Sequence, residues 1–257
     1  MNTGERNELL IKLRLVEMRM QNKSADVFNN EKIESVGFTG QEYLDIPIGY
    51  KNYSSLSDND LIALAKATHI AKAGIYDKAD VYINGVGYSI KSLSDAPPAL
   101  VNHTARDGWE RICSSINYDI KPLDDIIAKY WDLRLRGVIT EDVNNSNPYS
   151  PFAPHKDYLL PILNYFLFKG SGSRDSKSPA DYILDFTNPI DETTWEKYGN
   201  DYIDSHWDKL VFSLRSSKGM GNYPNIKKPT KKASMEKWTV YHSGGYKGAL
   251  HVRVKNN

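Results

Sequence analysis

The chain has a single cysteine, Cys113, among its 257 residues, so no disulfide can form within it. Its first residues, MNTGERNELL, include no apolar stretch of the kind found in a secretory signal. No window approaches the roughly 18 to 20 apolar residues that a membrane-spanning helix needs. We therefore expect a protein of the reducing cytoplasm that has no membrane partner.

The chain also lacks an excess of charge of either sign, because 33 Lys and Arg residues nearly balance 32 Asp and Glu residues. The net charge of +1 means that any surface for nucleic acid must come from local clusters of basic residues. No group of Cys and His residues has the spacing of a zinc site. The segment GSGSRDSK does not fit the phosphate loop Gly-x4-Gly-Lys-Ser/Thr, so we expect no nucleotide cofactor.

What the chain does have is the composition of a folded protein, with 40% hydrophobic and 25% charged residues. We expect a single domain over residues 1–257. This domain could include a C-terminal subdomain for DNA recognition, from about residue 169 to 257. A β-rich run predicts a strand over Tyr182–Phe186. Apolar residues at helical spacing predict helices over Glu8–Met20, Leu61–Lys72, Thr104–Ile116, Pro122–Gly137 and Lys156–Phe168, and a helical piece around Trp195–Leu210.

The most informative segment is ADVYINGVGYSIKS, residues 79–92. Asn84-Gly85 separates two β-rich runs, which is a strong signal for a hairpin with a two-residue turn. Counting outward from that turn along two antiparallel strands places Asp80 directly opposite Ser89. A carboxylate and a hydroxyl group are therefore predicted to share one face of the hairpin.

Lys91 is predicted to lie on the same face, because side chains along a strand alternate between its two sides. Val81, Ile83 and Ile90 then point the other way and form an apolar underside. In the simplest alternative, Asp80 and Lys91 form only a solvated ion pair across the strands, which would contribute little to stability.

This segment resembles the core of the PD-(D/E)XK nuclease superfamily, in which an Asp opens one strand and an acidic-x-Lys tripeptide lies on the next. Ala79-Asp80 corresponds to the first part, and Ser89-Ile90-Lys91 corresponds to the second. Ala79 stands in place of the usual Pro, which is a mild departure. Ser89 stands in place of the second acidic residue, and that change removes a metal ligand.

Some restriction endonucleases of this superfamily are similar in having Ser-x-Lys on the strand, with the missing carboxylate supplied by the following helix. The corresponding candidate is Glu110, and Asp107 is a weaker one because it also suits the first turn of the helix. Glu110 could equally be an exposed helix charge. The stretch PPALVNHTARDGWERIC also resembles the segment after the catalytic Lys in a group of type II restriction enzymes, so the resemblance covers about Asp80–Cys113.

The resemblance implies an α/β fold with a restriction-endonuclease-like core, in which helices flank a mixed central β-sheet. It also implies Mg²⁺, a hard cation that prefers oxygen ligands and lowers the pKa of bound water. Asp80 would be the main ligand, with the Glu110 carboxylate and the Ile90 backbone carbonyl as further ligands. Lys91 would orient the attacking water and stabilise charge, and Ser89 could hold a metal-bound water.

Two basic segments and one histidine are candidates for contacts with double-stranded DNA. Small and basic residues of the first segment suit phosphates or guanine edges, and a cluster near residues 215–232 could follow a DNA backbone. Both segments could instead be solvated surface, and the histidine could simply pack against its helix. The candidates are His103, Lys169, Ser171, Ser173, Arg174, Lys177, Arg215, Lys218 and Tyr223.

These inferences favour a Mg²⁺-dependent, sequence-specific endonuclease of the type II class, acting in a restriction-modification system. We expect a homodimer, since two-fold symmetry suits the cutting of both strands at a palindromic site. Two alternatives remain at this point. One is a repair or structure-specific nuclease with the same core, and the other is a non-catalytic DNA-binding protein in which Asp80 and Lys91 are structural.

Overall fold

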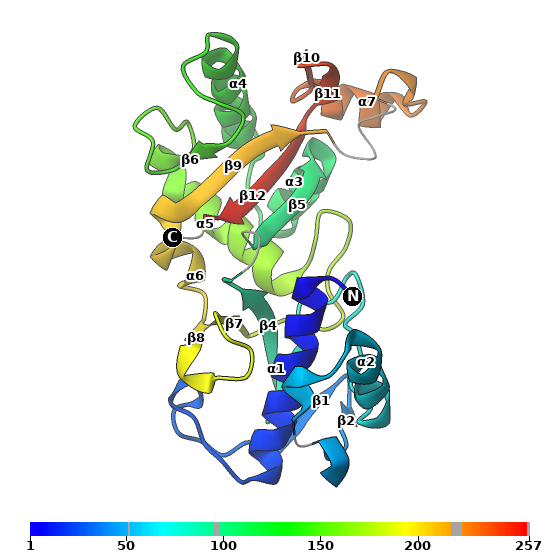
Figure 1. Cartoon of the computed structure of the whole chain (residues 1–257). Coiled ribbons are helices and arrows are strands. Elements are labelled where there is room, and N and C mark those ends of the chain that lie inside the picture. Colours follow the sequence, from blue (N-terminus) through cyan, green and yellow to red (C-terminus); the bar gives the residue numbers. More distant parts are fainter. Residues whose placement is uncertain (51, 95–97, 217–222, 256–257) are drawn as a thin grey trace. The chain divides into compact units, whose positions relative to one another are not determined.

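The computed structural model of the chain describes residues 1–50, 52–94, 98–216 and 223–255 (Figure 1). The chain forms two compact units, Met1–Ala96 with Ser176–Tyr202 and Pro97–Asp175 with Ile203–Asn257. A subdomain beginning near residue 169 coincides with neither unit, because Ser176–Tyr202 belongs with the N-terminal part of the chain. The roles assigned to a single endonuclease domain and to a recognition subdomain stay predictions.

The first unit is built on a six-stranded sheet in the order β2-β1-β3-β4-β7-β8. β4 and β7 run parallel, and the other neighbours are antiparallel, so the expected mixed α/β architecture is confirmed. Helices α1 (Thr3–Met20) and α2 (Asp58–Ala67) belong to this unit. The strands are β1 (Val36–Phe38), β2 (Gln41–Glu42), β3 (Val81–Ile83), β4 (Val86–Ser92), β7 (Tyr182–Phe186) and β8 (Trp195–Tyr198).

Helix α1 forms because its ends and its apolar residues both favour it. Asn2 and Glu5 cap each other's backbone N–H groups in a capping box, which fixes the start of the helix. Buried residues of α1 then pack in one core with Val81 and Ile83 of β3 and with Leu184 of β7. Val81, Ile83 and Leu184 are thereby fixed on one side of the sheet.

The hairpin between β3 and β4 has the predicted turn and register. Asn84 has φ +50° and Gly85 has φ +79°, the left-handed conformation that this type of turn requires at both positions. The Asn84 side chain also accepts hydrogen bonds from the N–H groups of Glu34 and Ser35, at 2.8 and 3.0 Å. Local turn chemistry and these tertiary bonds therefore fix the same alignment of the strands.

The second unit contains a four-stranded antiparallel sheet in the order β5-β12-β9-β6 and a separate β10–β11 hairpin. The strands are β5 (Ala99–Ala105), β6 (Val143–Asn144), β9 (Leu210–Arg215), β10 (Val240–His242), β11 (Gly245–Lys247) and β12 (Ala249–Val254). The helices are α3 (Arg106–Ser115), α4 (Lys121–Leu135), α5 (Lys156–Asn164) and α7 (Pro229–Glu236), with one π-helical turn at Tyr165–Lys169; short helix α6 (Tyr202–Ser205) spans the boundary of the units.

The helix expected over Leu61–Lys72 instead spans Asp58–Ala67. Two further expectations about local structure are wrong. The segment Trp195–Leu210 is not mainly helical, because Trp195 opens β8 and pairs with Phe186 of β7, and Leu210 opens β9. The helix expected from Thr104 begins at Arg106, since Ala99–Ala105 forms β5. In both places pairing with a strand distant in the sequence overrides the local preference.

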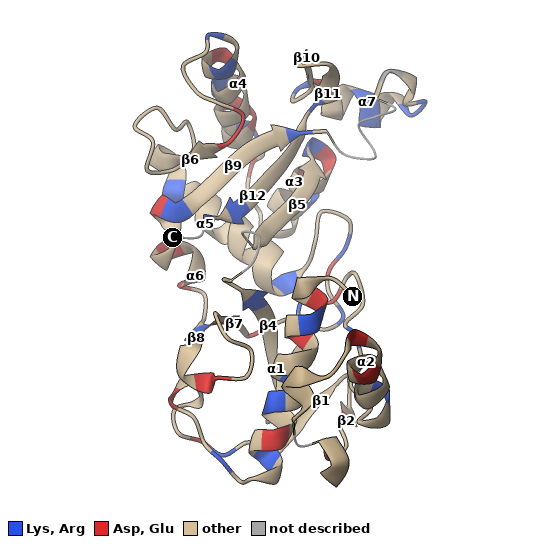
Figure 2. Ribbon diagram, in the orientation of Figure 1, with Lys and Arg blue, Asp and Glu red and all other residues tan. Residues whose placement is uncertain are grey.

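Charges are interspersed through the described parts of the chain, in line with its small net charge (Figure 2). Among the residues that the structure describes, no helix combines the length and the apolar character needed to cross a membrane.

Candidate functional site

Asp80 and Ser89 meet across the β3–β4 hairpin as the sequence predicts. The N–H of Asp80 donates to the carbonyl oxygen of Tyr88 at 2.8 Å, which continues the strand pairing past Val81. Asp80 Oδ2 accepts hydrogen bonds from the N–H of Ile90 at 2.7 Å and from Ser89 Oγ at 3.3 Å. One carboxylate oxygen is therefore anchored to β4, whereas Oδ1 accepts no hydrogen bond among the described residues.

Lys91 lies on the same face of the hairpin as Asp80 and Ser89, but it is not an ion-pair partner of Asp80. Lys91 lies two residues beyond Ser89 on β4 and is half-buried. The partners of the Asp80 carboxylate in the described part of the chain are Ile90 and Ser89. No ion pair between Asp80 and Lys91 is therefore found among these residues, and the charge of Lys91 instead acts on Asp185 and Lys78.

Asp185 of β7 is the acidic residue that sequence reasoning missed. It is the register partner of Lys91 in the parallel β4–β7 pair, and its side chain is fully buried. Burial raises the pKa of this carboxyl group to about 7, although the charge of Lys91 and the phenol of Tyr202 oppose the rise. The Tyr202 phenol lies beside this carboxyl group, but neither Asp185 oxygen makes a hydrogen bond of regular geometry within the described structure.

A buried carboxylate without hydrogen bonds is costly, which is why such a group indicates a ligand or a proton. The only signal for it in the sequence is one acidic residue within the apolar run YILDF, residues 182–186. That run correctly predicts a strand, but it does not reveal which strand lies beside it.

Lys78 supplies a second ammonium group near the hairpin. Burial and the charge of Lys91 lower the pKa of Lys78 to about 8, and the charge of Asp80 opposes this shift. The backbone of Lys78 is held by hydrogen bonds from its N–H group to the Ser178 carbonyl oxygen and to Ser176 Oγ. The unit thus gathers two carboxylates, two ammonium groups and a hydroxyl group around the middle of one sheet.

The donor set fits a hard divalent cation in part. No group of three or more His, Cys, Asp or Glu side chains suited to a metal is found among the described residues. Asp80 Oδ1 and the buried Asp185 carboxyl group are nevertheless oxygen donors on β3 and β7, the two strands that flank β4. Mg²⁺ commonly binds through one or two carboxylates, together with waters and substrate phosphate oxygens. The ligand role of the Ile90 carbonyl stays a prediction.

Glu110 of α3 lies in the second unit, where it has partners of its own. Its carboxylate forms an ion pair with Arg106 at 3.0 Å and accepts a hydrogen bond from Ser234 Oγ at 3.3 Å. Asp107 lies 3.5 Å from the ammonium group of Lys231. The metal-binding and catalytic role of Glu110 stays a prediction, and Asp185 is a competing candidate.

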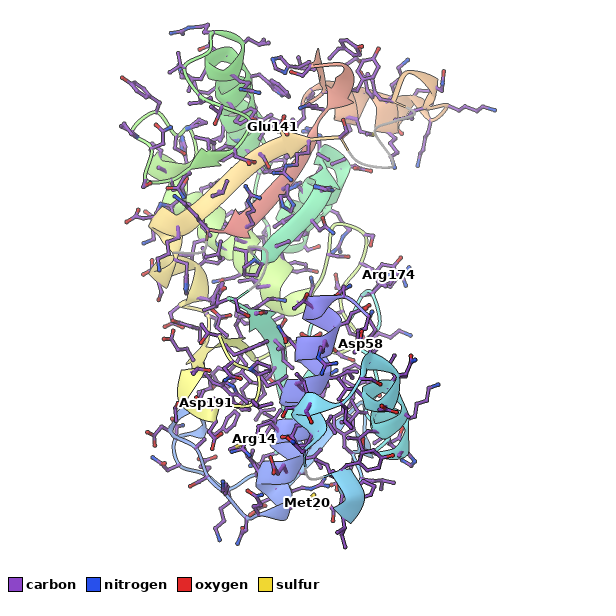
Figure 3. The ribbon with its side chains drawn as sticks, in the orientation of Figure 1. Arg14, Met20, Asp58, Glu141, Arg174 and Asp191 are labelled. Atoms are coloured by element: carbon purple, nitrogen blue, oxygen red, sulfur yellow. The ribbon has the colours of Figure 1, made fainter. Side chains whose placement is uncertain are left out.

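The first predicted DNA-binding segment is an ordered loop after the π-helical turn. Arg111 donates to the carbonyl oxygen of Ser171 and forms an ion pair of 2.8 Å with Asp175, and these contacts hold the loop against α3. Ser171 Oγ lies 3.1 Å from Ser173 Oγ and 3.2 Å from the Arg174 carbonyl oxygen. Four candidates have exposed side chains: Lys169, Ser173, Arg174 (Figure 3) and Lys177.

The other DNA-binding candidates have mixed environments. Tyr223 is buried against Tyr246, with ring centroids 5.2 Å apart, so its ring already has a packing partner. Arg215 forms an ion pair of 2.8 Å with Asp142. His103 lies in β5, whereas Lys218 lies outside the described residues. The DNA contacts of all these residues stay predictions.

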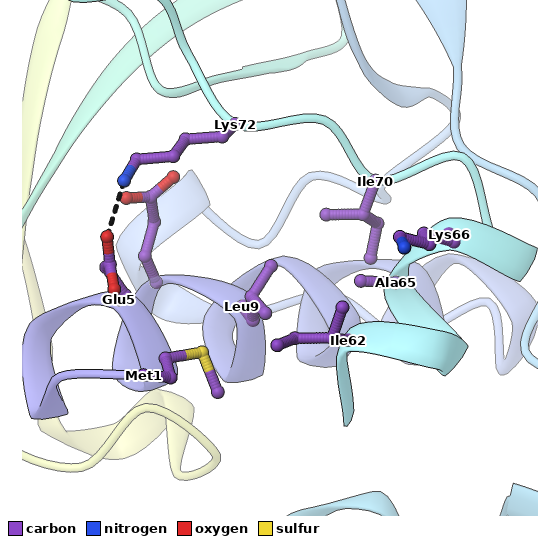
Figure 4. Close-up of a pocket in the computed structure, with 9 residues that line it drawn as sticks. Met1, Glu5, Leu9, Ile62, Ala65, Lys66, Ile70 and Lys72 are labelled. Atoms are coloured by element: carbon purple, nitrogen blue, oxygen red, sulfur yellow. Dashed lines mark hydrogen bonds and ion pairs between the residues drawn. The ribbon is translucent and has the colours of Figure 1, made fainter. Parts of the chain in front are cut away.

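A pocket of about 350 Å³ opens elsewhere in the first unit, between α1 and α2 (Figure 4). Its walls are mainly apolar, and an ion pair of 2.6 Å between Glu5 and Lys72 lies at its side. It is lined by Met1, Glu5, Glu8, Leu9, Ile62, Ala65, Lys66, Ile70 and Lys72. None of the hairpin residues lines it, so it is separate from the candidate site.

Known proteins show little similarity to this chain. No family model and no curated protein matches the chain. The structure is similar to that of restriction endonuclease MspI in complex with its cognate DNA, with a TM-score of 0.35 and 13% sequence identity. The match covers 79% of this chain and 80% of that chain. A likeness at this TM-score assigns neither a fold family nor an activity, so the function must be inferred from the residues of the chain itself.

Proposed function

We propose that the chain is a Mg²⁺-dependent endonuclease that hydrolyses phosphodiester bonds of double-stranded DNA, of the sequence-specific type II class. The observation that carries this proposal is the convergence of Asp80, Ser89 and Lys91 on one face of the β3–β4 hairpin. Buried Asp185 of β7 is the register partner of Lys91 on the neighbouring strand. This arrangement resembles the Asp and acidic-x-Lys pattern of the PD-(D/E)XK nucleases, with Ser89 in place of the acidic residue. It also supplies a second carboxylate where Ser89 has removed one.

The chemistry requires a deprotonated water and stabilisation of the negative charge that grows on the phosphate. Bound Mg²⁺ would supply a water of lowered pKa and a counter-charge. Ile90 and Ser89 hold one oxygen of Asp80, which leaves its other oxygen for the cation. We assign Asp185 as the second carboxylate, and its negative charge also orients the Lys91 ammonium group.

Lys91 then donates hydrogen bonds to the attacking water and to a phosphate oxygen. Its charge is worth more here than in bulk water, because the site is half-buried and the effective dielectric constant is lower. Lys78 adds positive charge on the same part of the surface, which favours an anionic substrate. The site therefore combines a place for a cation with two ammonium groups for the phosphate.

Incubation of the purified chain with phage DNA tests this proposal directly. We expect discrete fragments with Mg²⁺ and intact DNA with EDTA. Discrete fragments support a type II restriction role, whereas a smear or cleavage only at mismatches and branches would indicate a repair or structure-specific nuclease. Intact DNA under all metals and salts tried would leave a non-catalytic DNA-binding protein. Sedimentation of the same preparation tests the proposed homodimer.

The second carboxylate can be identified by comparing Asp185→Asn with Glu110→Gln. Each change removes one negative charge at nearly constant volume. We expect Asp185→Asn to lower the cleavage rate by about 10²-fold or more, and to raise the Mg²⁺ concentration needed for half-maximal rate. We expect Glu110→Gln to stay within about tenfold of wild type. The reverse order would assign the ligand role to Glu110.

A further inference from the structure

The four-stranded sheet of the second unit has one apolar face and one polar face. Along β9, Leu210, Phe212 and Leu214 alternate with Val211, Ser213 and Arg215, and β12 alternates in the same way. The buried apolar residues of one face form core. The opposite face carries charged and polar groups, of which Ser213 and His251 are buried beneath longer side chains. This polar face holds His103, Asp142, Ser213, Arg215, His251 and Arg253.

The register places four of these residues in one row across the sheet. His251 pairs with Ser213, and the His103 ring lies 4.7 Å from the His251 ring, measured between centroids. Asp142 directly precedes β6, whose Val143 pairs with Phe212, so Asp142 stands beside Ser213. Sequence reasoning marked only His103 of this row, because the other three join it through pairing of distant strands.

Asp142 holds two arginines on either side of the row. Its Oδ1 accepts from Arg215 at 2.8 Å, and its Oδ2 accepts from Arg253 at 2.7 Å. Glu141 precedes β6, and Figure 3 shows it near the end of β9. Its Oε1 lies 3.9 Å from Arg215 Nε. The side chains of Arg215 and Arg253 are still 29% and 25% exposed, so both guanidinium groups are oriented and remain accessible.

The two histidines contribute neutral hydrogen-bonding groups. Burial, followed by the charges of neighbouring groups, lowers the pKa of both rings, and that of His251 falls to about 4. A neutral imidazole has one N–H donor and one acceptor nitrogen. His103 Nε2 and His251 Nδ1 are buried and have no hydrogen-bond partner among the described residues. Buried polar atoms without a partner are rare, so their gathering in one row distinguishes this face from the apolar core.

We propose that this polar face of the second-unit sheet binds the DNA duplex and reads base edges, with Arg215 and Arg253 as the main contacts. This inference rests on the proposed function. A surface that only followed phosphates would need uncompensated positive charge, but here Asp142 is shared by both arginines. Arginines oriented by a shared carboxylate and still partly exposed suit the paired acceptors of guanine.

The test is duplex binding by the full chain in EDTA, which prevents cleavage. A duplex is first selected by the wild-type protein from a random-sequence pool, and a shuffled duplex serves as the reference. We expect Arg215→Gln and Arg253→Gln each to weaken binding to the selected duplex by about 5- to 150-fold, and to change shuffled-duplex binding by less than about threefold. Arg136→Gln is the matched control, because Arg136 is 61% exposed and also pairs with an aspartate, Asp132, at 3.1 Å.

The lysine variants Arg215→Lys and Arg253→Lys guard against simple loss of folding. They keep the charge that Asp142 requires and lose the planar fork, so they should fold and still lose preference for the selected duplex. Unchanged affinity in the folded variants, or equal losses on both duplexes, would overturn the base-reading role while nuclease activity stands. A wild-type chain that selects no duplex would overturn it too, and if phage DNA also stays intact the proposed function fails with it.

Discussion

Replacement of Asp80 by Asn, or of Lys91 by Ala, is expected to lower DNA cleavage by about 10³-fold or more. Asp80→Asn removes the charge that would bind the cation and keeps the shape that accepts hydrogen bonds from Ile90 and Ser89. Lys91→Ala removes the ammonium group beside Asp185. The measurement is the initial rate of supercoiled plasmid cleavage at saturating Mg²⁺, normalised to the folded fraction.

The matched controls are Asp45→Asn and Lys72→Ala in the same unit. The Asp45 and Lys72 side chains are 70% and 69% exposed, and each forms only a surface ion pair. Both variants should cleave at the wild-type rate, since exposed pairs contribute little to stability. Substantial activity in Asp80→Asn or Lys91→Ala would contradict the proposed site, even if the chain proves to be a nuclease.

The part of the site that was predictable from the sequence lies within one hairpin. Asn84-Gly85 specifies a turn with two positive φ angles, and the register of that turn is enough to predict Asp80 opposite Ser89. The chemistry of these residues was visible because they lie within a dozen positions of one another. Short-range geometry of this kind follows from local steric rules.

Asp185 could not be found in that way, because it lies 94 positions beyond Lys91, its partner across a parallel pair. Parallel strands need a long crossover, and nothing in YILDF specifies which strand it joins. The same limit applies to the row of His251, Ser213 and Asp142 in the second unit. Residues that only tertiary pairing brings together leave no local pattern.

The pH dependence of stability provides the second large effect, and it depends on Asp185. Burial raises the pKa of Asp185 to about 7 in the folded chain, whereas an unfolded Asp titrates near 3.9. Between these values the folded state retains a proton that the unfolded state releases. The contribution of protonated Asp185 to the free energy of unfolding is therefore complete below about pH 4, and it is lost as the pH rises through about 7.

In EDTA, the difference in unfolding free energy between Asp185→Asn and wild type should therefore grow in favour of the variant as the pH rises from 5 to 8. The upper limit over this pH range is roughly 3 kcal/mol, because the folded pKa of about 7 lies two units above pH 5 and each unit corresponds to about 1.4 kcal/mol. Urea unfolding at several pH values measures this difference, with Asp45→Asn as the control that should show no such trend. A difference that is constant with pH would contradict a buried, ionisable Asp185.

Binding of Mg²⁺ should offset the destabilisation that ionised Asp185 causes at high pH. A cation that binds ionised Asp185 should stabilise the wild-type chain more at pH 8 than at pH 5, because ligand binding to the folded state adds to its stability. Asp185→Asn should lose most of this response. An identical Mg²⁺ response in the variant would remove Asp185 from the metal site and return Glu110 as the second carboxylate. A buried charge that weakens the empty fold is therefore expected to be the group that binds the cation.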